Sequence, residues 1–318
     1  MNQTSSLTTF LTEDGGARLL FAETTALVQT AADRHHPSKT VTAALGRCLT
    51  AAAIMGGTLK DAGGSLTLRL NGGGPAGSFT CVADSEGNVR GCCDNPQAEL
   101  PPNAQGKLDV GGVVGRAGDL YVVRDYGFGE PYVGYVKLVS GEVAEDITSY
   151  YAVSEQIPTV CALGVRVEQD GRLKGAGGFL LQLLPGAEDS LAQLLEDRVR
   201  ALPSLSQLIA DGKRAEEIAA LVFGDIPYAL LESRDARYRC NCQRARYRRS
   251  IQSIGIQELK EMRDSGQEAE VICRFCGERY VFPPAELAEM YDERVRELRL
   301  SAEARRQAAA QGDSGTDA

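Results

Sequence analysis

The chain has 318 residues, 43% of them hydrophobic and 24% charged, with a formal net charge of −9. This composition is that of a globular protein and excludes a disordered chain, while the length favours one large domain plus a smaller module. No apolar run reaches the roughly 20 residues that span a bilayer, and the N-terminal segment lacks the basic and apolar regions of a signal peptide. We therefore expect a soluble cytoplasmic protein with no membrane partner.

The first 185 residues alternate between helical and extended patterns. Ser38 is a suitable N-cap for a buried helix over 42–55, which is rich in Ala and Leu and has no internal Pro. Apolar residues then follow a period of two from Leu66 to Leu70, which predicts a strand. Turn residues between short apolar segments predict three hairpins, which pair 78–82 with 88–92, 120–124 with 132–138, and 160–168 with 173–184. Residues 1–185 are therefore interpreted as an N-terminal α+β core domain built on antiparallel sheet, with helices.

After Pro185 the pattern returns to helical spacing. One apolar stripe consists of Leu191, Leu194, Leu195, Val199 and Leu202. Because such a stripe must pack against another surface, we interpret 186–235 as a helical linker that docks on the first domain. The segment 236–300 is expected to be a small separate module. The sequence beyond it is rich in Ala, Gln and Asp, so 301–318 are expected to form a disordered tail.

Two close pairs of cysteines carry the main chemical signal, CNC at 240–242 and CRFCG at 273–277. In a reducing compartment such pairs indicate metal binding or redox chemistry rather than static disulfides. Four thiolates can surround one Zn²⁺ tetrahedrally and leave no position for water or substrate, so the site would be structural or sensory rather than hydrolytic. The predicted ligands are Cys240, Cys242, Cys273 and Cys276. Two separate redox motifs are the alternative.

The five remaining cysteines are scattered along the chain. They are Cys48, Cys81, Cys92, Cys93 and Cys161. Without metal-ligand spacing they are expected to be small, unreactive residues of the core.

A cluster of six arginines surrounds the first cysteine pair, and the segment 236–257 contains no acidic residue. The arginines are Arg237, Arg239, Arg244, Arg246, Arg248 and Arg249. Positive charge beside a cysteine favours the thiolate, the form that attacks oxidants. The same pattern is also typical of a solvated basic helix face. A third interpretation is nucleic-acid contact, with Tyr238 and Tyr247 as stacking surfaces.

The free energy of zinc binding is large enough to control whether the module is folded. A structural zinc site contributes on the order of 10–16 kcal/mol at neutral pH, whereas a whole domain is stable by only about 5–15 kcal/mol. Loss of the metal should therefore unfold a module that is too small for a large core. If the linker helices rest partly on that module, their Leu-rich stripes would become exposed, and exposed apolar surface binds unfolded chains.

At these residues the sequence resembles the heat shock protein 33 family of redox-regulated chaperones. The resemblance includes the cysteine spacing, the CRFCGERYVF segment at 273–282, and two blocks outside the module, YYAVSEQIPT at 150–159 and GGFLLQLLPG at 177–186. Gln243 departs from the family, which usually has a small residue after the CxC pair, and the tail beyond Ser301 is long.

The resemblance implies an ATP-independent holdase that is inactive when reduced and bound to one Zn²⁺ per chain. Peroxide or hypochlorite, together with unfolding stress, would activate it. Carried over by position, the disulfides formed after zinc leaves would be Cys240–Cys242 and Cys273–Cys276. The resemblance also implies that the protein binds unfolded or aggregation-prone clients and forms a homodimer on activation.

Two other classes of function are less well supported by the residues. An enzyme lacks its usual motifs, because His35 and His36 are the only histidines, Gly72–Gly74 lacks the lysine of a phosphate loop, and no Gly-x-Ser-x-Gly occurs. A zinc-ribbon nucleic-acid-binding protein is the alternative, supported by the arginine cluster alone. We therefore expect no catalytic residues and no nucleic-acid partner.

Overall fold

The computed structural model describes residues 4–61 and 63–312, and the chain divides into two compact units, Met1–Cys240 and Asn241–Ala318. In the first unit the strands are β1 (Ser5–Thr12), β2 (Ala17–Glu23), β3 (Ser65–Gly73), β4 (Phe79–Asp84), β5 (Asn88–Cys93), β6 (Gly115–Asp125), β7 (Tyr132–Lys137), β8 (Thr159–Val167), β9 (Leu173–Leu183) and β10 (Tyr228–Tyr238). Its helices are α1 (Thr25–His35), α2 (Lys39–Gly56), α3 (Val110–Val114), α4 (Ala144–Tyr150), the π-helix η1 (Tyr151–Glu155), α5 (Asp189–Ala201), α6 (Leu205–Ala210) and α7 (Ala215–Phe223). The expected α+β class is confirmed.

A single sheet of ten strands organises the first unit, in the order β7-β6-β3-β4-β5-β10-β1-β2-β9-β8. All three predicted hairpins are present as antiparallel pairs, β4 with β5, β6 with β7, and β8 with β9. Neighbouring strands are antiparallel throughout except for β10 and β5, which pair in parallel over two residues only. The sheet therefore consists of two antiparallel halves, which β10 joins.

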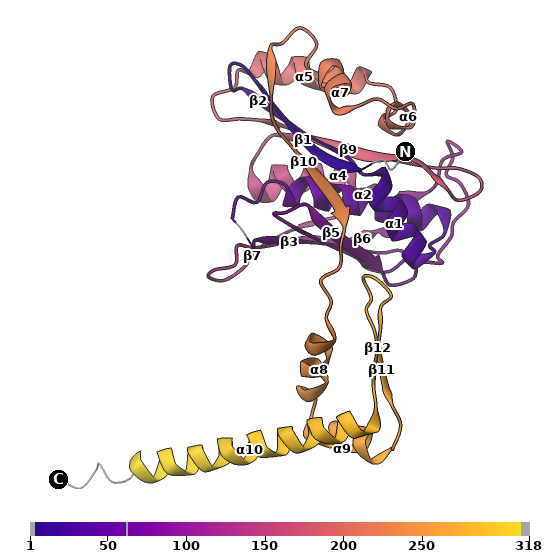
Figure 1. The fold of residues 1–318 in the computed structure, drawn as a ribbon. Coiled ribbons are helices and arrows are strands. Elements are labelled where there is room, and N and C mark those ends of the chain that lie inside the picture. The colour runs from indigo at the N-terminus through magenta and orange to yellow at the C-terminus, as the bar shows by residue number, and fades with distance from the viewer. Residues whose placement is uncertain (1–3, 62, 313–318) are drawn as a thin grey trace, which may run out of the picture. The chain divides into compact units, whose positions relative to one another are not determined.

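Helix α2 lies between the two halves of the sheet (Figure 1). Ser38 caps it as predicted, since its hydroxyl accepts a hydrogen bond from the amide of Val41 at 3.1 Å. All of its residues are buried except Lys39 and Arg47. A helix that is apolar all round is stable only when it is covered on all sides. Helix α1 precedes α2 in the chain and ends at His35.

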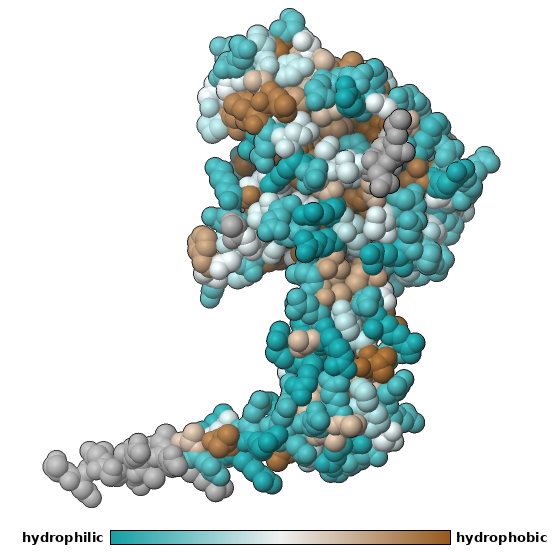
Figure 2. All heavy atoms as spheres, viewed as in Figure 1, coloured by the Kyte–Doolittle hydropathy of each residue, from teal (hydrophilic) through white to brown (hydrophobic). Residues whose placement is uncertain are grey.

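Helices α5, α6 and α7 cover the opposite face of β1, β2 and β9 (Figure 1). Their contacts form a second core with the alternate residues of the strands, such as Leu19 and Phe21 of β2. Most of the predicted stripe takes part, including Leu195, which is only 1% exposed, but Leu194 is 41% exposed. In Figure 2 hydrophobic side chains are visible on the surface of this part of the unit, among hydrophilic ones.

The last part of the predicted helical linker has a different structure. Residues 228–235 belong to β10, which pairs with β1 in antiparallel register. Leu231 is the extra residue where this register shifts, between the pairs Thr9–Glu232 and Phe10–Leu230. Such a bulge disrupts the regular alternation of a strand. For this reason the segment did not show the period of two by which the other strands were recognised.

The second unit is small. It contains α8 (Arg244–Gln252), α9 (Ile256–Asp264), the hairpin of β11 (Ala269–Ile272) and β12 (Arg279–Phe282), and α10 (Pro284–Gly312). Its core consists of Ile251, Leu259, Phe282, Leu287 and Met290, with partly buried side chains around them. Of the tail that was expected to be disordered, 301–312 continue α10, whose Ala, Arg and Glu residues favour helix, and 313–318 lie outside the described residues.

Among the residues described, none of the helices combines the length and the apolar character that a transmembrane segment requires.

The second core predicts a contrast between two positions on α7. Ile218 is fully buried beneath the helix, whereas Leu221 is 42% exposed. Ile218→Ala should lower the free energy of unfolding by about 2–5 kcal/mol because it leaves a cavity. The control Leu221→Ala should change it by less than about 0.5 kcal/mol. Urea unfolding of the reduced protein measures both values, and equal effects would show that α7 is not packed as described.

Candidate metal centre

The four predicted ligands converge in space. The sulfur atoms of Cys240, Cys242, Cys273 and Cys276 all lie within 4.8 Å of one another. The first pair lies between β10 and α8, and the second pair lies in the turn between β11 and β12. The Sγ atoms of Cys242 and Cys276, one from each pair, are 3.4 Å apart. We refer to these residues as the four-cysteine cluster.

The turn that carries the second pair is fixed by its own backbone. The amide of Gly277 donates to the carbonyl of Cys273 at 2.8 Å, and the amide of Cys273 donates to the carbonyl of Glu278 at 2.8 Å. Gly277 has a φ of +73°, which glycine adopts without steric cost. The turn therefore directs the sulfurs of Cys273 and Cys276 to the same side.

The cluster favours thiolates. Burial alone would raise the pKa of the Cys273 thiol, but hydrogen bonds from the Tyr247 hydroxyl and from the amides of Phe275 and Cys276 lower that pKa to about 7. The hydroxyl of Tyr280 donates to the Sγ of Cys242 at 3.2 Å. Because metals bind cysteine as the thiolate, this environment suits a metal cation.

The sulfur positions fit zinc. A Zn–S bond of about 2.3 Å places neighbouring sulfurs of a tetrahedron about 3.8 Å apart. The upper limit of 4.8 Å and the single distance of 3.4 Å bracket that value. Zn²⁺ could therefore bind with small movements of the four side chains, and these four sulfurs make up a complete tetrahedral ligand set.

The other five cysteines lie outside the cluster. Cys48 and Cys81 are fully buried, Cys92 is nearly so, and Cys93 and Cys161 are partly exposed. Burial raises the pKa of the thiols of Cys48, Cys81 and Cys161 well above its usual range. These three are therefore poor nucleophiles at neutral pH, in agreement with their predicted role in the core.

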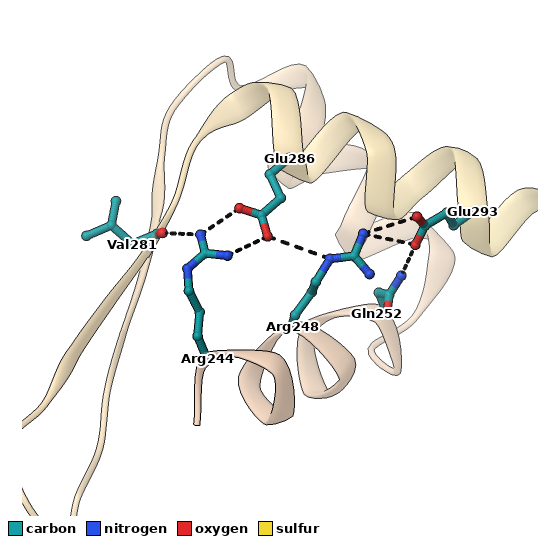
Figure 3. Close-up of polar contacts among 6 residues, drawn as sticks. All are labelled: Arg244, Arg248, Gln252, Val281, Glu286 and Glu293. Atoms are coloured by element: carbon teal, nitrogen blue, oxygen red, sulfur yellow. Dashed lines mark hydrogen bonds and ion pairs between the residues drawn. The ribbon is translucent and has the colours of Figure 1, made fainter. Parts of the chain in front are cut away.

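Two of the six arginines are paired with carboxylates of α10 (Figure 3). Arg244 forms two hydrogen bonds to Glu286, at 2.8 and 2.6 Å, and also donates to the carbonyl of Val281. Arg248 bridges Glu286, at 3.6 Å, and Glu293, at 3.0 Å. The guanidinium of Arg244 also lies 4.5 Å from the centre of the Phe282 ring. We call these contacts the ion-pair ladder, and they join α8 to α10. The charges of Arg244 and Arg248, which the sequence analysis considered for nucleic-acid contact, are therefore paired with carboxylates of the same unit.

The sequence did not indicate that Tyr247 and Tyr280 form hydrogen bonds to cysteines of the cluster. Tyr247 was considered as a stacking surface for bases, but its ring packs on that of Tyr280, with the ring centres 5.0 Å apart. Each is four or five residues beyond a cysteine pair, which is the only sequence signal. Of the two histidines, His35 lies 3.2 Å from the Tyr238 hydroxyl through its Nε2 atom, at the end of α1.

Comparison with known proteins gives a consistent result. The family model described as Hsp33 protein matches residues 5–283. A 33 kDa chaperonin of Clostridium botulinum is 43% identical over 282 residues, which cover 89% of this chain and 95% of that protein. One from Clostridium acetobutylicum is 44% identical and covers 87% and 94%. The crystal structure of the heat shock protein 33 homologue of Thermotoga maritima superposes with a TM-score of 0.86 at 35% identity, covering 92% of this chain and all of that chain.

The ion-pair ladder predicts salt-sensitive stability of the second unit. Glu286→Gln removes the charge that both Arg244 and Arg248 contact, so the thermal midpoint of this unit should fall by about 2–5 °C, with a weaker dependence on salt. Glu289→Gln is the matched control, since Glu289 is exposed on the same helix. Differential scanning calorimetry of the reduced protein at low and high salt measures both, and an unchanged midpoint for Glu286→Gln would refute the ladder's role.

Proposed function

Because this chain belongs to the Hsp33 family, we propose that it is a redox-regulated holdase, which binds unfolded or aggregation-prone proteins once its four-cysteine cluster is oxidised. The observation that carries the proposal is the convergence of four sulfurs, three of which belong to the second unit, whose core is small. The chaperone role is supported by the name 33 kDa chaperonin, which the clostridial relatives carry. We propose a cytoplasmic location as well, because four cysteines this close together stay reduced in a reducing compartment.

In the reduced state, Cys240, Cys242, Cys273 and Cys276 hold one Zn²⁺. When bound, zinc supplies a closed cross-link between two segments that are thirty residues apart in the chain. Such a site contributes on the order of 10–16 kcal/mol, comparable to the stability of an entire domain. The apolar core of the second unit, with five buried side chains among the described residues, is small by comparison. The four thiolates therefore determine whether 236–300 stay folded.

Oxidation by peroxide removes the ligands in pairs. The sulfur of one thiolate attacks a peroxide oxygen, the O–O bond breaks, and the released hydroxide takes a proton and leaves as water. The second thiolate of the pair attacks the resulting sulfenic sulfur and displaces another hydroxide, which also becomes water. The formation of each disulfide thus transfers two electrons from a pair of thiolates to one peroxide molecule. The expected pairs are Cys240–Cys242 and Cys273–Cys276, and Cys242–Cys276 is the competing product because those sulfurs lie 3.4 Å apart.

Unfolding then spreads to the linker, 186–235. Its helices contribute Leu195, Leu208, Ile218 and Val222 to the second core, and these apolar side chains would become available to clients. Exposed apolar surface also favours association of two copies, so we propose that activation is accompanied by homodimerisation. The reduced protein buries this surface and does not bind clients.

Replacing one ligand tests the metal assignment. Cys273→Ser should abolish stoichiometric zinc binding and destabilise the second unit, because three thiolates cannot close the tetrahedron. The control Cys93→Ser lies outside the cluster and should keep one zinc per chain. Zinc released to a colorimetric chelator from purified reduced protein measures the stoichiometry. Full zinc content in Cys273→Ser would exclude the proposed ligand set.

A client-aggregation assay tests the switch. Peroxide-treated protein should suppress the light scattering of a thermally unfolding client, whereas reduced, zinc-loaded protein should leave the scattering unchanged. Peptide mapping of the same oxidised sample identifies the disulfides. Equal scattering in the two states would refute redox control. Binding of a nucleic acid by the zinc-loaded protein, weakened by salt, would instead support the zinc-ribbon alternative.

A further inference from the structure

Two tyrosines connect the halves of the four-cysteine cluster in a crossed arrangement. Tyr247 lies on α8, which follows the first cysteine pair, and Tyr280 lies on β12, which follows the second pair. Their rings are in contact, with centres 5.0 Å apart and planes inclined by 38°. Both side chains are partly buried against the core of the second unit. The rings therefore hold the two hydroxyl groups in defined positions.

Each hydroxyl reaches a sulfur of the opposite pair. Tyr280 donates to the Sγ of Cys242 at 3.2 Å, and this hydrogen bond raises the pKa of its own hydroxyl. Tyr247 makes its side-chain hydrogen bond to Cys273. Each of these two hydrogen bonds therefore crosses to the cysteine pair that does not immediately precede the tyrosine in the chain. The two bonds therefore add to the cluster itself in linking the first segment to the second.

A hydrogen bond to a thiolate has two chemical consequences. It draws electron density away from the sulfur, which makes the sulfur a weaker nucleophile toward an electrophilic oxidant. It also fixes the orientation of the ligand, and groups around a metal that do so commonly change its affinity by one to two orders of magnitude. Both consequences favour the reduced, metal-bound state. Cys242 and Cys273 belong to different pairs, so both disulfides are affected.

We propose that Tyr247 and Tyr280 are positioning residues that set the oxidant threshold of the switch, by hydrogen-bonding Cys273 and Cys242 and slowing the attack of these sulfurs on peroxide. The step that they slow is the first one, in which a sulfur lone pair forms the S–O bond while the O–O bond breaks and hydroxide leaves. This inference rests on the proposed function, since it concerns the same four ligands. The two tyrosines would regulate the sensitivity of the switch without themselves binding metal or client.

Removal of the hydroxyl groups alone is the test. Tyr247→Phe and Tyr280→Phe keep the stacked rings and delete one O–H···S bond each. Each variant should release zinc about two to ten times faster than the parent when peroxide is added, which is the factor that a single hydrogen bond provides. Tyr291→Phe is the matched control, because that hydroxyl lies in the same unit but bonds to Arg263, and its release rate should equal that of the parent.

The absorption spectrum of the Co²⁺-substituted protein gives a second measurement. It would not change if the two tyrosines only stabilised the fold. With Co²⁺ in place of zinc, the sulfur-to-metal charge-transfer band should move to lower energy in both Phe variants and stay in place in Tyr291→Phe, because a sulfur without its hydrogen bond gives up charge more easily. Circular dichroism verifies folding, and either variant suffices if the other fails to fold. Parental release rates and bands in the folded variants would overturn the inference alone. A parent protein that binds neither metal would overturn the proposed function as well.

Discussion

The organisation of the second unit depends on one constraint, the meeting of four cysteine sulfurs from two turns that are thirty residues apart. The apolar core of this unit is small, and its further contacts include partly exposed ion pairs and a pair of tyrosine rings. Ion pairs of this kind contribute little each. A metal bound to the sulfurs would therefore contribute more to folding than all of the packing around it.

The first unit has the opposite character. Helix α2 is buried between the two halves of one sheet and also contacts the helices α1 and α3, and α5 to α7 cover part of the outer face of that sheet. The core around α2 contains no thiol of the cluster, so its apolar burial does not depend directly on the state of those four cysteines. A molecule built in this way combines a stable body with a conditional unit. This division suits the proposed switch, since the core around α2 can stay folded while the weaker part unfolds.

The parts that could be predicted are those with a local signal. Helix α2 and the three hairpins have regular periods and clear turns, and the cysteine spacing alone identified the cluster. Strand β2 was missed because Leu19, Leu20 and Phe21 are buried on both faces, which removes the alternation. Strand β10 lacks a local signal because the bulge at Leu231 breaks its alternation, and its partner β1 lies more than two hundred residues away in the chain. The partners of Arg248 were missed because they too are distant in the chain.

Hydrogen–deuterium exchange of the reduced protein, before and after the metal is removed by peroxide and a chelator, tests the central claim most directly. The account predicts that amides of 241–300 lose their protection when the metal is lost, while those of α2 and of the hairpins β4–β5 and β8–β9 keep theirs. Unchanged protection of 241–300 in the metal-free, oxidised protein would contradict it, because the fold of this unit would then not depend on the cysteine cluster.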